Sequence, residues 1–121
     1  MALVLCTGVD PVLMKTRQLI LENAGHTVIP ATDESEIKAT CARHKFEVAV
    51  IGQSISSKGK ARTVDLIRGQ CPDAKILELI APYASKTLAD ADAWLEMPSE
   101  PEELVNAVNS LASVPPKKKQ P

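Results

Sequence analysis

The segment ALVLCTGVDPVLMKTRQLILENAGHTVIPA, residues 2–31, decides the fold because it places an amphipathic stretch between two short apolar runs. The first run, residues 2–6, stops before a Gly and a Pro, as a buried strand does where it ends in a loop. Pro11 suits the first turn of a helix, and Gly25 suits its C-terminal cap. Apolar residues at spacings of 7, 8 and 11 from Leu13 give that helix an inner face. With a second strand at 26–31, the segment predicts a strand, a helix and a strand.

The same alternation continues through the rest of the chain. Further strands are expected at 46–51, 75–80 and 93–97. Further helices are expected from a capping box of Asp33 and Glu36 to about His44, after a polar loop at 54–60, and from Ser99 with Glu102 as its box partner. Strands that alternate with helices through short loops predict a doubly wound α/β fold, in which a parallel sheet is covered on both faces.

The connection between the last two strands is short. Only thirteen residues separate Ile80 from Trp94, and the fifth strand itself needs some of them. A helix of less than about two turns gains little from its own hydrogen bonds. We therefore expect the helix of this connection, the fourth in the chain, to be shortened to a turn or missing.

Length, charge and cysteine content exclude several classes of protein. The 121 residues fit one domain, expected at 1–112 and followed by a flexible basic tail at 113–121. A formal net charge of -1 disfavours nucleic acid and anionic membranes as partners, and no apolar run is long enough for a membrane span. The three widely spaced cysteines, Cys6, Cys41 and Cys71, predict reduced core residues and no zinc site. We expect a cytoplasmic protein without a metal or another cofactor.

Three longer patterns carry a resemblance to a known family. They are DPVLMKTRQLILENAGHTV (10–28), FEVAVIG (46–52) and ADAWLEMPSEPEELVNAV (91–108). In order and spacing they resemble parts of the receiver domain of bacterial two-component response regulators, and the likeness covers 2–112. The resemblance implies a flavodoxin-like (CheY-like) five-stranded sheet of order 2-1-3-4-5, whose functional groups lie at the carboxyl ends of the strands.

The residues that receivers use for phosphorylation are missing from the matching positions. The acidic pair that holds magnesium falls on Gly8 and Val9, although Asp10 stands at the next, often acidic position. The phosphoacceptor aspartate falls on Gly52, which has no nucleophile. One carboxylate makes a poor magnesium site. The resemblance therefore implies that the family's route of phosphotransfer is excluded.

The two remaining receiver groups are missing as well. The hydroxyl at the end of the fourth strand falls on Ile80, and the lysine of the fifth strand falls on Met97. Only the aromatic position of the fifth strand still has an aromatic residue, Trp94. Together these losses predict a degenerate pseudo-receiver with an apolar, uncharged pocket and no enzymatic activity.

Two functions from different classes are compatible with this interpretation. The leading hypothesis is a phosphorylation-independent module of bacterial signal transduction that binds a protein partner or a second copy of itself. The alternative is a small-molecule or nucleotide binder at the strand carboxyl ends, where hydrogen bonds would come from Asp10, Gln53, Ser54 and Ser56.

The missing helix predicts where a partner binds. Glu78 is a charge within an otherwise apolar strand, so we expect it at a groove that the missing helix leaves uncovered. Trp94 on the neighbouring strand and Tyr83 in the connection would line the same groove. In the alternative arrangement, the shortened connection collapses over Trp94 and buries it.

Overall fold

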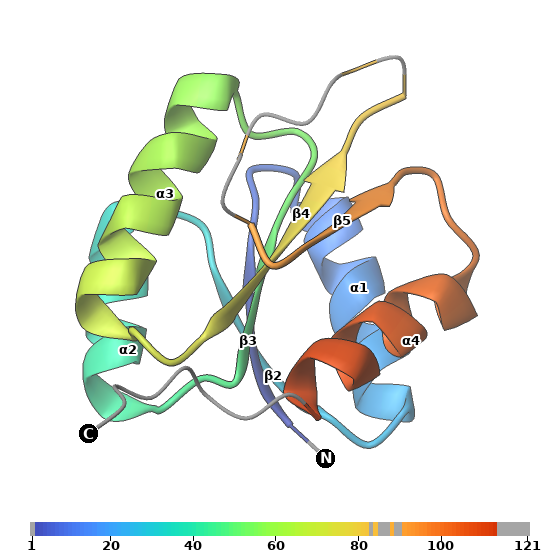
Figure 1. Cartoon of the computed structure of the whole chain (residues 1–121), viewed down its shortest axis with the longest axis horizontal. Coiled ribbons are helices and arrows are strands. Elements are labelled where there is room, and N and C mark those ends of the chain that lie inside the picture. The colour runs from blue at the N-terminus through green and yellow to red at the C-terminus, as the bar shows by residue number, and fades with distance from the viewer. Residues whose placement is uncertain (1, 83, 85–87, 89–90, 114–121) are drawn as a thin grey trace.

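The computed structural model describes residues 2–82, 84, 88 and 91–113, which form a five-stranded sheet and four helices. The strands are β1 (Leu3–Thr7), β2 (Thr27–Ala31), β3 (Val48–Ile51), β4 (Lys75–Ile80) and β5 (Ala93–Glu96). The helices are α1 (Pro11–Asn23), α2 (Glu34–Arg43), α3 (Ser57–Gln70) and α4 (Pro101–Ala112). The strand order is β2-β1-β3-β4-β5, and every neighbouring pair is parallel (Figure 1). The predicted flavodoxin-like fold is confirmed.

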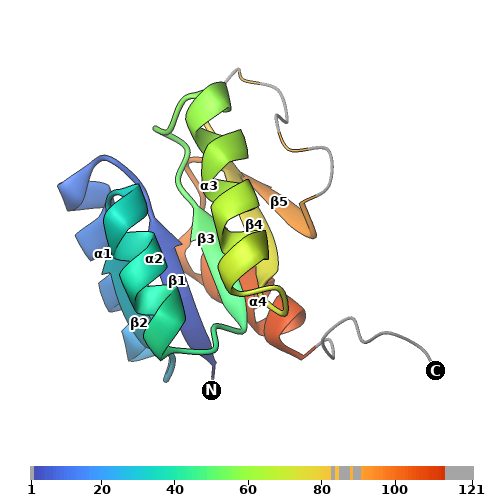
Figure 2. The ribbon, with the colours of Figure 1, turned by 90° about the vertical axis from the view of Figure 1, so that its left-hand side faces the viewer.

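Two helices cover each face of the sheet. α1 and α4 lie on one face, and α2 and α3 lie on the other, as the two views in Figures 1 and 2 show. Successive side chains of a strand point to opposite faces. In β1, Leu5 packs into the core on the α2 and α3 side, whereas Val4 and Cys6 pack into the core on the α1 and α4 side. Burial on both faces explains why the strands are almost continuous apolar runs.

Side-chain caps determine where α2 and α3 begin. Asp33 accepts a hydrogen bond from the backbone N–H of Glu36, so the predicted start of α2 is confirmed. The polar loop predicted at 54–60 is wrong in its second half, because Ser56 caps α3 and the helix begins at Ser57. The residues of this segment from Ser57 onward are therefore helical.

The start of α4 also differs from the prediction. Its capping box is formed by Glu100 and Glu103, with Pro101 in the first turn, and not by Ser99 and Glu102. The box is displaced by one residue because proline is well suited to the first helical position, directly after the cap.

The connection from β4 to β5 contains no helix among its described residues. Instead, Leu88 and Ala91 of this connection are buried in the core on the α2 and α3 side of the sheet. The helix of this connection was predicted to be shortened to a turn or missing, and the four helices of the described residues agree with that prediction. Tyr83 and the tail residues 114–121 lie outside the described residues. Within the part of the chain that is described, no helix is long and apolar enough to cross a lipid bilayer.

Candidate functional site

Two buried glycines meet at the carboxyl edge of the sheet, where the resemblance places the phosphorylation site. Gly8 follows β1 and Gly52 follows β3, and the N–H of Gly52 donates to the carbonyl of Thr7 at 3.1 Å. A Cβ atom on Gly52 would lie 2.9 Å from that carbonyl oxygen and 3.3 Å from the Cα atom of Gly8. A Cβ atom on Gly8 would lie 3.2 Å from Cγ of Met14. Neither position has room for a side chain unless its neighbours move.

The side chain of Arg17 reaches the same place from α1. It is 5 % exposed, and its Nη1 atom would lie 3.3 Å from a Cβ atom on Gly52. Its Nη2 atom donates a hydrogen bond to Oε1 of Gln53. Arginine stays positively charged in proteins at neutral pH. The prediction of an uncharged pocket is therefore wrong, because a guanidinium group lies beside Gly52, which the resemblance aligns with the phosphoacceptor aspartate.

Burial and charge shift the ionisation of two groups at this edge. Burial lowers the pKa of Arg17 from its usual value, while Cys6 and Asp10 act in the opposite direction. Burial also raises the pKa of the Cys6 thiol to about 12, and the nearby Arg17 only partly opposes this effect. Cys6 is thus a protonated core thiol at neutral pH, in agreement with the prediction of reduced core cysteines.

The spacing of residues in α1 could have indicated that Arg17 is buried, but the prediction considered apolar residues only. The buried residues of α1 are Met14, Arg17 and Leu21, spaced by three and four. That spacing places Arg17 on the inner face of the helix. Predictions based on apolar residues had placed Ile20 there, which is only half buried.

Asp10, which follows Gly8 and Val9, has a structural role. Its Oδ1 atom accepts hydrogen bonds from the N–H groups of Val12 and Leu13 at 3.0 and 3.3 Å, so it is the N-cap of α1. Val9 beside it is exposed. The only acidic side chain carried over from the receiver pattern is therefore engaged in starting a helix.

Ile80 and Met97, which the resemblance aligns with the hydroxyl and the lysine of receivers, lie together at the ends of β4 and β5. The N–H of Met97 donates to the carbonyl of Ile80 at 2.8 Å, and the bond between Met97 and Pro98 is cis. Ile80 is buried and Met97 is half buried. Neither supplies the hydroxyl or the cation of a receiver, and the described residues contain no cluster of three or more side chains suited to hold a metal ion.

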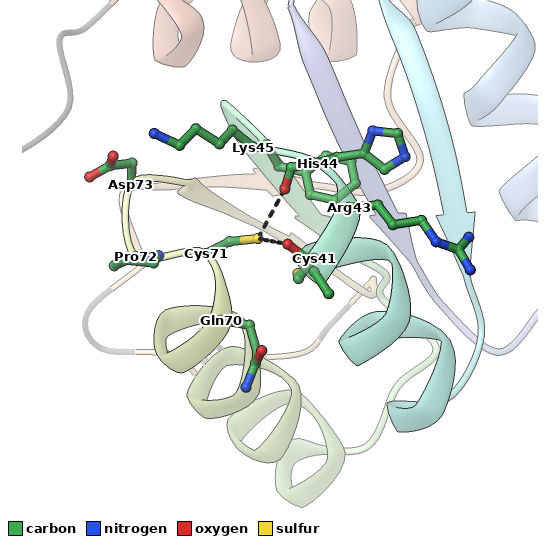
Figure 3. Close-up of a pocket in the computed structure, with 10 residues that line it drawn as sticks. Cys41, Arg43, His44, Lys45, Gln70, Cys71, Pro72 and Asp73 are labelled. Carbon is green, nitrogen blue, oxygen red and sulfur yellow. Dashed lines mark hydrogen bonds between the residues drawn. The ribbon is translucent and has the colours of Figure 1, made fainter.

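A pocket of about 390 Å³ lies away from this site, at the C-terminal ends of α2 and α3 (Figure 3). Cys41 and Cys71 both line it, and both are buried and free. The sequence places these cysteines far apart, whereas the Sγ atom of Cys71 lies 3.9 Å from the carbonyl oxygen of Cys41. The predicted reduced core cysteines therefore include a neighbouring pair.

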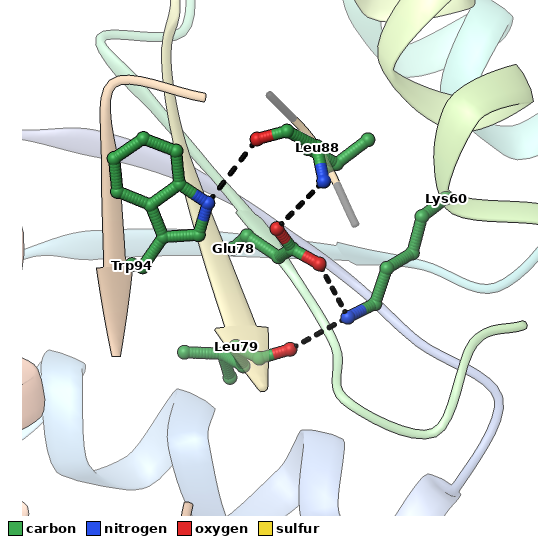
Figure 4. Close-up of polar contacts among 5 residues, drawn as sticks. All are labelled: Lys60, Glu78, Leu79, Leu88 and Trp94. Carbon is green, nitrogen blue, oxygen red and sulfur yellow. Dashed lines mark hydrogen bonds and ion pairs between the residues drawn. The ribbon is translucent and has the colours of Figure 1, made fainter. Parts of the chain in front are cut away.

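A buried ion pair lies on the α2 and α3 side of the sheet (Figure 4). Nζ of Lys60 donates to Oε2 of Glu78 and to the carbonyl of Leu79, both at 2.8 Å. Oε1 of Glu78 accepts from the N–H of Leu88 at 3.0 Å. Nε1 of Trp94 donates to the carbonyl of the same Leu88 at 3.2 Å. The ion pair and the indole together hold Leu88 of the β4–β5 connection against the sheet.

The predicted partner groove is wrong for Glu78. Its exposure is 0 %, because Lys60, expected in a solvated loop, enters the core from α3 and neutralises its charge. Trp94 is half buried and packs against the core, so the connection covers it in part. Tyr83 lies outside the described residues. For Trp94 and Tyr83 the interaction surface stays a prediction.

Comparison with known proteins supports the receiver fold. No protein-family model matches the chain, and no curated protein matches it. Chemotaxis protein CheY4 of Vibrio cholerae is 24% identical and superposes with a TM-score of 0.78, over 92% of this chain and 98% of that one. For a response regulator from Thermotoga maritima these values are 22%, 0.79, 94% and 99%. For a Burkholderia pseudomallei response regulator with a phosphorylated aspartic acid, calcium ion and citrate, they are 25%, 0.77, 93% and 69%. The chain therefore has the fold of CheY-like receiver domains.

Proposed function

We propose that this chain is a pseudo-receiver that takes part in bacterial signal transduction through protein contacts and without phosphorylation. The observation that carries the proposal is the position of Arg17, whose guanidinium group lies beside Gly52. Gly52 provides no carboxylate to phosphorylate. The proposal assigns residues 1–112 to this domain and 113–121 to a basic tail, in a cytoplasmic protein without enzymatic activity.

The charge of Arg17 also argues against a magnesium site. A divalent cation needs several oxygen ligands, and the side chains of Gly8 and Val9 offer none. The guanidinium group would repel a second cation at short range in a site of low dielectric constant. In this proposal the domain has the receiver scaffold, and the side chain of Arg17 lies where receivers have their phosphorylation site.

Exposed apolar side chains of α1 and of the residue just before Asp10 favour protein contact. The large hydrophobic side chains that are exposed in the described chain are Val9, Val12 and Leu19. All three lie on α1 or just before it, and Val12 and Leu19 share one face of the helix because they are seven residues apart. Exposed apolar groups that gather on one element favour a protein-binding surface. Trp94, half buried on the edge strand β5, is a second proposed contact residue.

The alternative, a small-molecule or nucleotide binder, receives less support. Three of the four side chains expected to hold a ligand already have partners inside the protein. Asp10 caps α1, Ser56 caps α3, and Gln53 accepts from Arg17. A ligand would have to displace these bonds. Thermal-shift screening separates the two functions, because a ligand at 100 times its Kd stabilises a protein by about 2.7 kcal/mol.

Intact-mass spectrometry after incubation with acetyl phosphate and Mg²⁺ tests the proposal. We expect no adduct on the native chain. Gly52→Asp should also stay unmodified, because the new carboxylate would lie against Arg17 and the side chains of Ile80 and Met97 supply neither hydroxyl nor lysine. A phosphoryl adduct of about 80 Da on the native chain would overturn the proposal.

A substitution of Leu19 tests whether a partner binds to the exposed apolar side chains of α1. Leu19→Lys should weaken self-association or binding to an identified partner in sedimentation velocity. Lys38→Gln, an exposed substitution on α2 at the other face of the sheet, is the matched control and should leave association unchanged. Equal association of both variants would assign the contact to a different surface and contradict the role of α1.

A further inference from the structure

Cys41 and Cys71 are separated by 30 positions in the sequence but meet between α2 and the end of α3 (Figure 3). Cys41 lies in the last turns of α2, and Cys71 is the C-cap of α3. The Sγ atom of Cys71 lies 3.9 Å from the carbonyl oxygen of Cys41 and 3.8 Å from that of His44. The sulfur atom of Cys71 is therefore a direct neighbour of the backbone of Cys41.

The contact brings the two residues into the range in which a disulfide is worth testing. In disulfides the two Cβ atoms are about 3.5–4.5 Å apart, and side-chain torsions set the sulfur positions. The Sγ atom of Cys71 already reaches the backbone of Cys41 at 3.9 Å. A disulfide requires that rotation of the two side chains brings sulfur to sulfur.

The pair borders a pocket that small oxidants can enter. Both cysteines line the pocket of about 390 Å³, which is far larger than a peroxide molecule. Cys6 provides a contrast, because it lies within β1 and packs into the core on the opposite face of the sheet. It is buried and has no thiol within its own core to pair with, since Cys41 and Cys71 lie on the other side.

We propose that Cys41 and Cys71 form a dithiol site that peroxides oxidise to an intramolecular disulfide, which fastens α2 to the end of α3. One thiol loses its proton and attacks an oxygen of hydrogen peroxide. The S–O bond forms, the O–O bond breaks, and the leaving hydroxide takes up a proton and departs as water, so that a sulfenic acid remains. The second thiol then attacks the sulfenic sulfur, and its proton leaves with the hydroxyl group as a second water. The peroxide is reduced and the two sulfur atoms are oxidised, so atoms and electrons balance.

The protonation state of the pair gives the pH dependence of this reaction. Burial and the neighbouring Cys71 raise the pKa of the Cys41 thiol to about 12. Because the thiolate is the attacking species, oxidation should become faster as the pH rises from 7 towards 10. The site lies away from Arg17 and does not depend on the proposed signalling function.

The test is oxidation of the full chain with hydrogen peroxide at pH 8, followed by alkylation in denaturant and mass spectrometry. We expect a mass loss of about 2 Da, from two hydrogens, and one of the three thiols left for alkylation. Trypsin should then release peptides 39–43 and 69–75 as a linked pair. Reduction with dithiothreitol should restore all three thiols.

Single substitutions separate this pair from a general oxidation of cysteines. Cys41→Ser and Cys71→Ser should each abolish the linked peptides, whereas Cys6→Ser should leave them unchanged. Disulfides between chains, separate sulfinic acids, or three unreacted thiols on the native chain would each overturn the proposal. The peptide map of the native chain decides this even if a variant does not fold.

Discussion

Replacement of Lys60 by Met should destabilise the domain by about 3–5 kcal/mol, because it leaves a buried carboxylate without its cation. Glu78 is 0 % exposed and Lys60 is 4 % exposed, so water screens neither charge. Met has nearly the volume of the lysine stem, so packing changes little and the loss is mainly electrostatic. The carboxylate also accepts a hydrogen bond from the N–H of Leu88 at 3.0 Å.

The magnitude has a physical ceiling. In the variant, burial without a cation raises the pKa of Glu78, and the carboxyl group avoids further cost by taking up a proton. At pH 7 this costs about 3.7 kcal/mol for a group with an ordinary pKa of about 4.3, at 1.36 kcal/mol for each pH unit. Loss of the hydrogen bond from Lys60 to Leu79 adds about 1 kcal/mol. The loss should therefore shrink as the pH falls towards 4.

Urea denaturation followed by fluorescence of Trp94, the single tryptophan, and by circular dichroism measures the effect. Lys58→Met is the matched control, because this lysine is exposed on the same helix and its loss should change stability by less than about 0.5 kcal/mol. The double variant Lys60→Met with Glu78→Leu should recover most of the loss, since an apolar pair can replace a buried ion pair. Equal stability of the Lys60 and Lys58 variants would refute the role of the ion pair.

Three further predictions concern single side chains. Gly52→Ala should cost about 1–3 kcal/mol because its Cβ atom would lie 2.9 Å from a carbonyl oxygen, whereas Gly69→Ala in α3, with open space around it, should be neutral or stabilising in the same urea titration; equal costs would contradict the close approach at Gly52. Hydrogen bonds from Thr32 lower the pKa of Glu36 in the folded protein, so its contribution to stability is present above its ordinary pKa and is lost as the pH falls through the lowered pKa. Glu36→Gln should flatten the acid limb of a stability-against-pH curve, and an unchanged limb would refute this. Cys6 has its pKa raised from 9.0 to about 12, so stability is complete below pH 9 and falls between pH 9 and 12 as the unfolded chain ionises; Cys6→Ala should reduce this alkaline slope, and an equal slope would count against it.

The strands and most helix boundaries could be predicted because they depend on local patterns. The bounds predicted for β4 from the apolar run at 75–80 agree with those of the structure, and Asp33 correctly predicted the start of α2. Both signals act over a few neighbouring residues, through periodic burial and a single cap.

The polar contents of the core could not be predicted in the same way. Lys60 and Glu78 are 18 positions apart, and each alone reads as a solvent-exposed charge. Only the packing of α3 on β4 brings them together. Arg17 was missed for a related reason, since it lies on a buried helix face and finds its acceptor, Gln53, 36 positions away. Charges that are compensated across the fold leave little trace in local sequence.

We propose that the carboxyl edge of this receiver fold does not respond to a phosphoryl group. NMR titration of the ¹⁵N-labelled chain with Mg²⁺ and beryllofluoride, a phosphoryl mimic, tests the claim most directly. We expect the amide signals of Gly8, Gly52 and Gln53 to stay in place, because the site has no acceptor carboxylate and already contains the Arg17 guanidinium. Saturable shifts centred on these three residues would contradict it.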